Sequence, residues 1–414
     1  MEDNLYRIDK NFELEQMNQK TKPNYLLIDI IFLLVIVSIL QQFSFFNSYY
    51  SLIRKVIYLI GFLAVILAIR HFFKIKIDNF TRYFLFLFLS FQVLSLIGIL
   101  FGNSLNNIGT LYIPISISFF IYMTSFVISK NSNVKVYNIL IIIYATLILL
   151  LTINIFNTYF GEIFISSQYV YAQKNSKGPM IVFSILFGIF LILNLKSKIL
   201  KIFFLFSIVF EFLVLNLIRN RSGLVALYFA IFILILKSLK IKRISSILKL
   251  TIVILSILLF AIFASDLVTS IISSAIEVFI KNYNINDLSN LSAGRLEFYA
   301  QALSVFANNP IVGTLGIQNY YVDNAFLLVL ANYGLIGAIF YIPFILFVLY
   351  TIIINLRKNS IKDLRFYVSL AWLTALTISI FEGLPPFGPG TTYIIAWILL
   401  PLIISKNREK RMRI

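Results

Sequence analysis

The chain of 414 residues has no cysteine and a single histidine, His71. Without cysteine it has no disulfide bond, no thiolate metal site and no cysteine nucleophile. Its one histidine, which the predicted topology puts on the cytoplasmic side, also excludes a metal centre built from several histidines and hydrolysis by a Ser-His-Asp triad. The sequence therefore predicts a protein that works without a metal ion or another cofactor.

Acidic residues are also scarce, whereas apolar residues are in large excess. Hydrophobic residues make up 60% of the chain and its mean hydropathy is +0.92, whereas a soluble domain has about 45–50% apolar residues. A transmembrane helix needs about 20 consecutive apolar residues. We therefore predict an all-α integral membrane protein with about twelve transmembrane helices. They are expected near residues 25–43, 56–73, 83–101, 110–129, 136–158, 179–195, 200–218, 223–236, 248–265, 324–350, 366–381 and 391–404.

Polar segments divide the chain into five parts. Residues 1–23 carry both signs of charge and lack the layout of a cleavable signal peptide, so we expect a cytoplasmic tail. Residues 24–265 hold the first nine helices, and residues 324–404 hold the last three. A large external loop is expected over 266–323, and a basic cytoplasmic tail over 405–414.

The distribution of lysine and arginine predicts the orientation, because cytoplasmic loops of membrane proteins carry the positive excess. With both termini in the cytoplasm, 27 of the 35 basic residues face inward. The net charge of +18 then follows from topology and from attraction to membrane lipids, and we expect no nucleic-acid partner. The basic residues that face outward are Arg54, Lys55, Lys174, Lys177, Arg219, Arg221, Lys281 and Arg295.

Arg219 and Arg221 flank Asn220 at the outer end of the eighth predicted helix. That helix runs from outside to inside, so its N-terminus, with free N–H groups and the positive end of the helix dipole, points outward. Two guanidiniums at this point predict an anion site for phosphate or pyrophosphate. The alternative is that the arginines only extend toward the interface and that Ser222 caps the helix.

The loop over 266–323 is too long for a simple connection and is expected to carry a role of its own. An amphipathic helix is predicted near 293–307, with Ser292 as its cap, because apolar residues recur there at helical spacing. Arg295 lies in its first turn, where a cation is unfavourable unless an anion binds it. The alternative is a solvated arginine paired with Glu297 or Glu277.

Three carboxylates lie near the outer ends of predicted helices. Asp323, which precedes Asn324 at the start of the tenth helix, is either an N-cap or a general base. Glu382 stands beside proline and glycine in FEGLPPFGPG, and is either a second candidate base or a solvated loop residue. Glu211, in the seventh helix, is expected to be structural, with an arginine or a tyrosine hydroxyl as its partner.

Four segments together resemble a known family. They are NRSG at a helix start, AGRLEFY in the large outer loop, and then NNPIVGTLG and VDNAFLLVLANYGLIG. In this order, over roughly residues 170 to 385, they resemble the Wzy-type polysaccharide polymerases, in the superfamily that also holds the O-antigen ligases. The ligases carry a histidine just before the asparagine that opens the helix after the loop. Here that position is Asp323, which favours a polymerase.

The resemblance implies a membrane enzyme similar in fold to C-type glycosyltransferases. Its substrates would be undecaprenyl-pyrophosphate-linked oligosaccharides at the outer leaflet of a bacterial plasma membrane, and a chain-length regulator and a flippase are possible partners. The implied products are O-antigen, capsule or another exopolysaccharide. Residues implied in catalysis are Arg219, Arg221, Arg295 and Asp323, and those implied in substrate binding are Lys174, Asn175, Asn324 and Glu382.

Two other functions stay open at the level of sequence. A ligase would pass the glycan to a different acceptor, and a flippase would move the lipid-linked sugar without reaction. Flippases and other transporters commonly have internal repeats, and the two halves of this chain show no duplication. The single large outer loop also favours an enzyme over a transporter.

Overall fold

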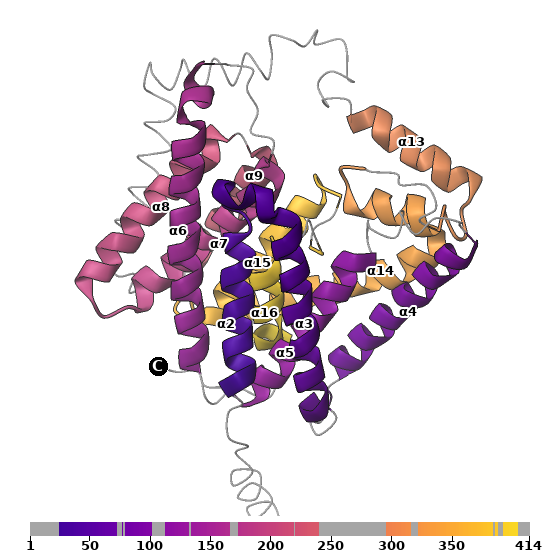
Figure 1. The fold of residues 1–414 in the computed structure, drawn as a ribbon, viewed down its shortest axis with the longest axis horizontal. Coiled ribbons are helices and arrows are strands. Elements are labelled where there is room, and N and C mark those ends of the chain that lie inside the picture. Colours follow the sequence, from indigo (N-terminus) through magenta and orange to yellow (C-terminus); the bar gives the residue numbers. More distant parts are fainter. Residues whose placement is uncertain are drawn as a thin grey trace, which may run out of the picture.

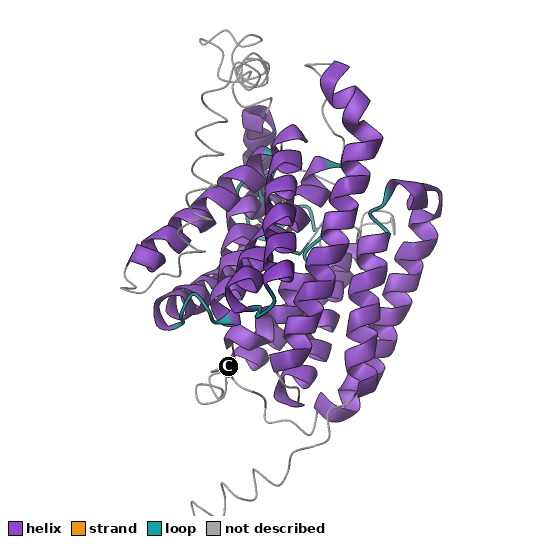
Figure 2. Ribbon diagram, turned by 90° about the vertical axis from the view of Figure 1, so that its left-hand side faces the viewer, coloured by secondary structure: helices purple, strands orange, loops and turns teal. Residues whose placement is uncertain are grey.

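The computed structural model describes residues 25–72, 77, 79–101, 112–131, 134–165, 173–218, 220–239, 295–315, 322–383, 386–387 and 392–404. Within these ranges the chain forms helices and loops and no strand (Figure 2), as the all-α prediction requires. Outside them lie both predicted tails, the predicted ninth helix at 248–265, and most of the large loop, including Lys281 and Ser292.

The described helices coincide with eleven of the twelve predicted apolar runs, and one more helix lies in the large loop (Figure 1). That helix is α13, and it covers most of the stretch predicted to be amphipathic. The helices are α2 (Tyr25–Leu40), the 3-10 helix η1 (Ser44–Tyr49), α3 (Tyr50–Phe72), α4 (Asn79–Phe101), α5 (Tyr112–Asn131), α6 (Val134–Ile165), α7 (Lys174–Asn194), α8 (Lys198–Leu217), α9 (Arg221–Leu239), α13 (Arg295–Asn308), α14 (Ala325–Lys358), α15 (Leu364–Ser379) and α16 (Ile394–Ile404).

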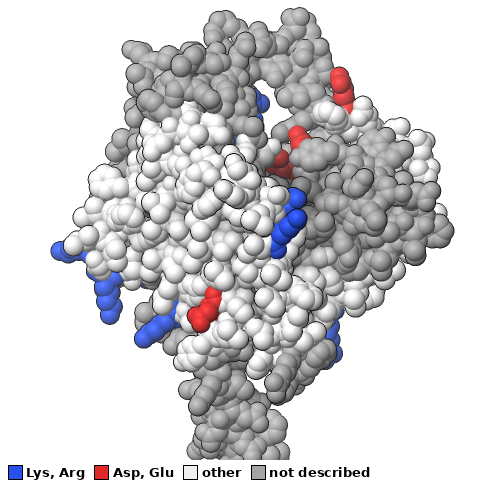
Figure 3. Space-filling view, in the orientation of Figure 1, with Lys and Arg blue, Asp and Glu red and all other residues white. Residues whose placement is uncertain are grey.

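The outer surface of the bundle is apolar. Among the described residues, six helical segments are long and apolar enough to cross a membrane: Ser44–Ile69, Lys135–Tyr159, Lys174–Asn194, Lys198–Leu217, Arg221–Ser238 and Ala325–Lys358. Large side chains such as Phe206, Ile339 and Tyr350 point outward and are more than half exposed. The described part of the face in Figure 3 is mostly uncharged. These features are those of a protein embedded in a membrane.

The centre of the bundle is formed by α7, α15 and α16. Every residue of α7 from 177 through 192 is buried, so this helix is surrounded by protein on nearly all sides. Trp397 of α16 stacks on Phe387 at 5.4 Å between ring centroids and meets the edge of Trp372 at 4.9 Å. Its indole Nε1 donates to the Pro386 carbonyl at 2.8 Å. The loop that follows α15 is therefore anchored to the aromatic core.

Glu211 of α8 is a buried carboxyl group inside this bundle. Its Oε1 accepts hydrogen bonds from Ser184 of α7 at 2.8 Å and from Ser207 of α8 at 3.3 Å. The expectation of an arginine or a tyrosine partner is therefore wrong. Short serine side chains replace them because α7 and α8 pack closely along their length.

Helix ends gather at two opposite ends of the bundle. At one of them, which we call the Asn355 end, Asn355 of α14 donates to the Ile403 carbonyl of α16 at 3.0 Å. Lys237 of α9 donates there to the carbonyls of Leu356 and Arg357, at 2.9 and 2.7 Å. The last turns of α9, α14 and α16 thus meet. Their first turns, with the first turn of α7, lie at the opposite end, which we call the Glu382 end.

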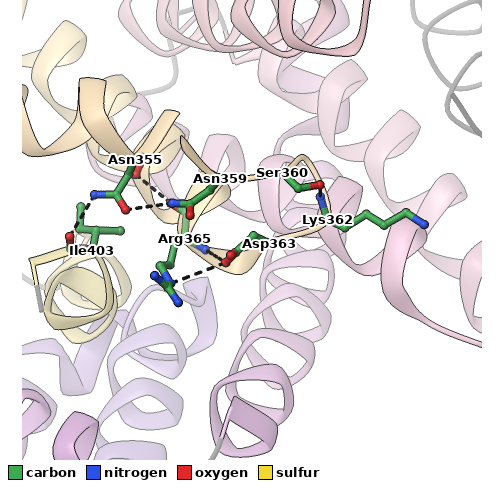
Figure 4. A network of polar contacts seen from close by, with 8 residues as sticks. Asn355, Asn359, Ser360, Lys362, Asp363, Arg365 and Ile403 are labelled. Carbon is green, nitrogen blue, oxygen red and sulfur yellow. Dashed lines mark hydrogen bonds and ion pairs between the residues drawn. The ribbon is translucent and has the colours of Figure 1, made fainter. Parts of the chain in front are cut away.

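Polar side chains fix the connection between α14 and α15 at the Asn355 end (Figure 4). Asn359 donates to the Asn355 side-chain oxygen at 2.9 Å, and Asp363 caps α15 by accepting from the Arg365 N–H at 2.9 Å. Basic residues that the sequence assigns to the cytoplasm surround this connection. They are Lys237, Arg357, Lys358, Lys362 and Arg365.

The helix α14 is broken at Gly334, where the sequence predicts a continuous helix. Gly334 has φ 58° and ψ −153°, and the turn over 309–315 pairs with the broken backbone. Leu335 N–H donates to the Pro310 carbonyl at 2.8 Å, and Thr314 N–H donates to the Ala331 carbonyl at 3.0 Å. A Cβ on Gly334 would lie 2.5 Å from the carbonyl oxygen of Ile311. Glycine therefore permits both the break and the close approach of the turn.

Replacing Gly334 by alanine should destabilise the protein. The new methyl group meets backbone atoms of the turn, and the positive φ adds strain of about 1–3 kcal/mol. Gly61 of α3 is the matched control, because a Cβ there meets nothing within 4 Å. Thermal unfolding in detergent should show a lower Tm for Gly334→Ala, and an unchanged or slightly higher Tm for Gly61→Ala. Equal Tm values for the two variants would contradict this account of the break.

Candidate functional site

Glu382 joins three helices at the Glu382 end. It follows α15 and is 5% exposed. Its Oε2 accepts from Asn175 Nδ2 of α7 at 2.8 Å, and its Oε1 accepts from Ser222 Oγ of α9 at 3.2 Å. The reading of Glu382 as a solvated loop residue is therefore wrong, because contacts from distant parts of the chain cover it.

Asn220 fixes the spacing between the first turns of α7 and α9. Its Oδ1 accepts a hydrogen bond from the Gly223 N–H at 2.7 Å, and this bond caps α9. Its Nδ2 donates to the Lys174 carbonyl at 3.0 Å. The helix is therefore capped by Asn220 and not by Ser222. A Cβ on Gly223 or Gly178 would overlap the Asn220 side chain. Glycine at these two positions allows the asparagine to lie between the helices.

Basic residues stand on both sides of this contact. Lys174 precedes Asn175 and is half-buried, and Arg221 precedes Ser222 and is exposed. Lys177, one turn further along α7, is 1% exposed, an uncommon position for a lysine. The first turns of α7 and α9 add the positive ends of two helix dipoles. This part of the site therefore favours an anion. Arg219 lies outside the described residues.

Asn324, not Asp323, caps α14. Its Oδ1 accepts from the N–H groups of Phe326 and Leu327 at 2.9 and 3.0 Å. The alternative that makes Asp323 the N-cap is therefore wrong. Both residue types cap helices well, and the helix begins one residue later than that alternative requires. Asn324 Nδ2 also donates to the Ile380 carbonyl at 3.0 Å, which ties this start to the end of α15.

Asp323 and Glu382 belong to neighbouring segments. The bond from Asn324 to Ile380 holds the two segments together, and Gly383 packs against the Val322 carbonyl. Asp323 is partly exposed, and its carbonyl accepts from the Tyr299 hydroxyl of α13 at 3.0 Å. The helix α13, which starts at Arg295, is thereby connected to the same region. The Arg295 side chain is not among the described ones.

Six of the residues predicted for the site come from segments that meet at the Glu382 end. They are Lys174, Asn175, Arg221, Asp323, Asn324 and Glu382. Sequence reasoning did not assign Asn220 as a cap or Ser222 as a partner of Glu382. It also missed Thr392, whose hydroxyl donates to the Ser176 carbonyl at 2.9 Å. The preference of asparagine for N-cap positions is the local signal for the cap, whereas the partners of Ser222 and Thr392 are too distant in sequence to be predicted from local patterns.

In the part of the chain that the structure describes, no three His, Cys, Asp or Glu side chains lie together in a way that could hold a metal ion. Comparison with protein-family models and with curated protein sequences gives no match for this chain. The arrangement of these residues and the resemblance of the four segments therefore carry the functional proposal.

Substitutions of Glu382 should separate its charge from its role as an acceptor. Glu382→Ala leaves the Asn175 amide and the Ser222 hydroxyl without their acceptor, at a cost of about 1–3 kcal/mol for a buried group. Glu382→Gln can accept from Asn175 with its oxygen and donate to Ser222 with its amide. We expect a clear fall in Tm for the alanine variant and little change for the glutamine variant.

The exposed Glu297 of α13 provides the control for these measurements, since Glu297→Ala should leave the Tm unchanged. A Glu382→Ala variant as stable as this control would show that the carboxylate does not hold α7 and α9 together.

Proposed function

We propose that this protein is a membrane polymerase that joins undecaprenyl-pyrophosphate-linked oligosaccharide repeat units into a polysaccharide. The observation that carries the proposal is that the four family-like segments meet at one end of the bundle. Ser222 of NRSG bonds to Glu382, whose segment is tied to Asn324 of VDNAF. Tyr299 of AGRLEFY bonds to Asp323, and the turn in NNPIVGTLG pairs with α14 at its break.

The donor pyrophosphate is assigned to the basic side of the site. Charge develops on the leaving pyrophosphate when the glycosidic carbon is attacked, and fixed guanidiniums stabilise such charge without moving. Arg221 and Lys174 stand at two converging helix starts, where backbone N–H groups also favour an anion. Arg219 and Arg295 are proposed to complete this set on the basis of the sequence.

Asp323 is the better candidate for the base. The acceptor hydroxyl must lose a proton as its oxygen bonds to the anomeric carbon and the bond to the pyrophosphate oxygen breaks. Both oxygens of Glu382 already accept hydrogen bonds that hold α7 and α9. Asp323 is partly exposed, and its side chain does not cap α14. We assign proton removal to Asp323 and positioning of the site to Glu382.

We further propose that about twelve helices cross the membrane, in an arrangement similar to C-type glycosyltransferases, with the Glu382 end outside a bacterial plasma membrane. Described basic residues support this orientation. Lys196, between α7 and α8, and Lys198 and Lys201, at the start of α8, lie at the same end as Lys237 and Arg357. An excess of lysine and arginine such as this one is typical of the cytoplasmic side of a membrane protein. Both termini would then lie in the cytoplasm.

Single cysteines test the orientation, because the native chain has none. Asn309 and Lys198 are both exposed and lie toward opposite ends of the bundle. In intact cells, a membrane-impermeant maleimide should label Asn309→Cys and should label Lys198→Cys only after the membrane is opened. The reverse pattern would place the Glu382 end in the cytoplasm and would remove the outer-leaflet proposal.

Asp323→Asn tests the chemistry. Because Asn324 caps the helix, this variant should fold normally, yet loss of a general base should lower polymerisation about 100-fold. Purified protein would be supplied with single lipid-linked repeat units, and the products would be separated by chain length. Asp363→Asn is the control, because Asp363 caps α15 at the opposite end and asparagine caps equally well.

The same assay distinguishes the alternatives. A polymerase yields a ladder of longer lipid-linked chains and releases lipid pyrophosphate, whereas a ligase needs a different acceptor and a transporter leaves the units unchanged. A normal ladder from Asp323→Asn would refute the assignment of the base, and no ladder from the wild-type protein would refute the polymerase.

A further inference from the structure

Tyr393 lies beside the carboxylate site but has no role in the mechanism described above. It precedes α16 and is 1% exposed. Its ring meets Phe183 of α7 edge-on, with 5.6 Å between the ring centroids. The neighbouring Thr392 hydroxyl donates to the Ser176 carbonyl at 2.9 Å. Two contacts with α7 thus fix Tyr393 next to the turn that carries Asn175, a partner of Glu382.

The Tyr393 hydroxyl has no hydrogen-bond partner in the described part of the chain. Buried polar groups nearly always have one, and an exception calls for a water molecule, a ligand or a function. A phenol has one O–H group and lone pairs on its oxygen, so it can both donate and accept a hydrogen bond.

The neighbourhood favours a neutral ligand over an anion. The Glu382 carboxylate repels a phosphate group at this position. The basic residues Lys174 and Arg221 belong instead to the starts of α7 and α9, where they precede Asn175 and Ser222 in the chain. A sugar hydroxyl has no charge, and it matches a phenol that can give and take one hydrogen bond. The site thus divides into a part for the pyrophosphate and a part for uncharged sugar.

We infer that the Tyr393 hydroxyl binds a hydroxyl group of the acceptor sugar, and that Tyr393 is a substrate-contacting residue. This inference rests on the proposed polymerase function. It assigns Tyr393, at the start of α16, to the acceptor, and the first turns of α7 and α9 to the donor.

A second tyrosine provides the control. Tyr367 of α15 is also fully buried, and within the ranges that the structure describes its hydroxyl has no hydrogen-bond partner. Its ring packs against Phe190 in the last part of α7, toward the Asn355 end and away from the proposed site. Phenylalanine at either position removes one hydroxyl that has no hydrogen-bond partner among the described residues. Neither substitution should lower the stability, since an unsatisfied buried group contributes nothing favourable to the fold.

The experiment compares Tyr393→Phe and Tyr367→Phe in the full-length protein. A repeat-unit glycoside without pyrophosphate serves as the acceptor, and the lipid-linked unit serves as the donor. For Tyr393→Phe we expect an unchanged or higher Tm, a KM for the glycoside raised about tenfold, and an unchanged KM for the donor. Tyr367→Phe should match the wild-type protein in both KM values.

Each other result has a defined meaning. If the wild-type protein makes no glycosidic bond, the polymerase proposal and this inference both fail. If the wild type is active, the inference alone fails when Tyr393→Phe keeps the wild-type KM for the glycoside, changes the KM for the donor instead, or lowers the Tm. It fails as well when Tyr367→Phe raises the KM for the glycoside by the same factor.

Discussion

The Glu382 carboxylate accepts one hydrogen bond from the first turn of α7 and one from the first turn of α9. In lipid, apolar surface alone does not drive helices together, so polar bonds and close backbone packing decide which helix ends meet. Glu382 supplies such bonds, and Asn220 supplies the packing, because it lies against Gly178 and Gly223. The positions of Lys174 and Arg221 relative to each other depend on these two residues.

The broken α14 gives the site its second half. Before Gly334 the helix carries Asn324, which holds the end of α15, and after Gly334 it runs 24 residues to Lys358. One element thus serves two purposes, since its first part positions Asp323 and its second part is long enough to cross a membrane. The contact of Tyr299 with Asp323 then brings α13 to the same place.

The sequence is sufficient to predict the helices but not the partners of the polar residues. Apolar runs predict helices well because a chain in lipid must satisfy its backbone hydrogen bonds within each segment. The break at Gly334 is not predictable in this way, because glycine is common inside transmembrane helices. Whether Asp323 or Asn324 caps α14 depends on a shift of one residue in where the helix begins. The periodicity of apolar residues does not fix a helix start to one residue. Burial of Glu382 depends on Asn175, 207 residues earlier in the chain.

The pairing of the 309–315 turn with α14 uses main-chain atoms, through Pro310, Ile311 and Thr314 on one side and Ala331, Leu335 and Ile336 on the other. Hydrogen bonds between main-chain atoms do not require particular side chains at the residues that form them. Most side chains of this turn can therefore be replaced while its hydrogen bonds to α14 are kept. The joint between α13 and α14 is therefore a part of the molecule where the sequence can change without loss of the fold.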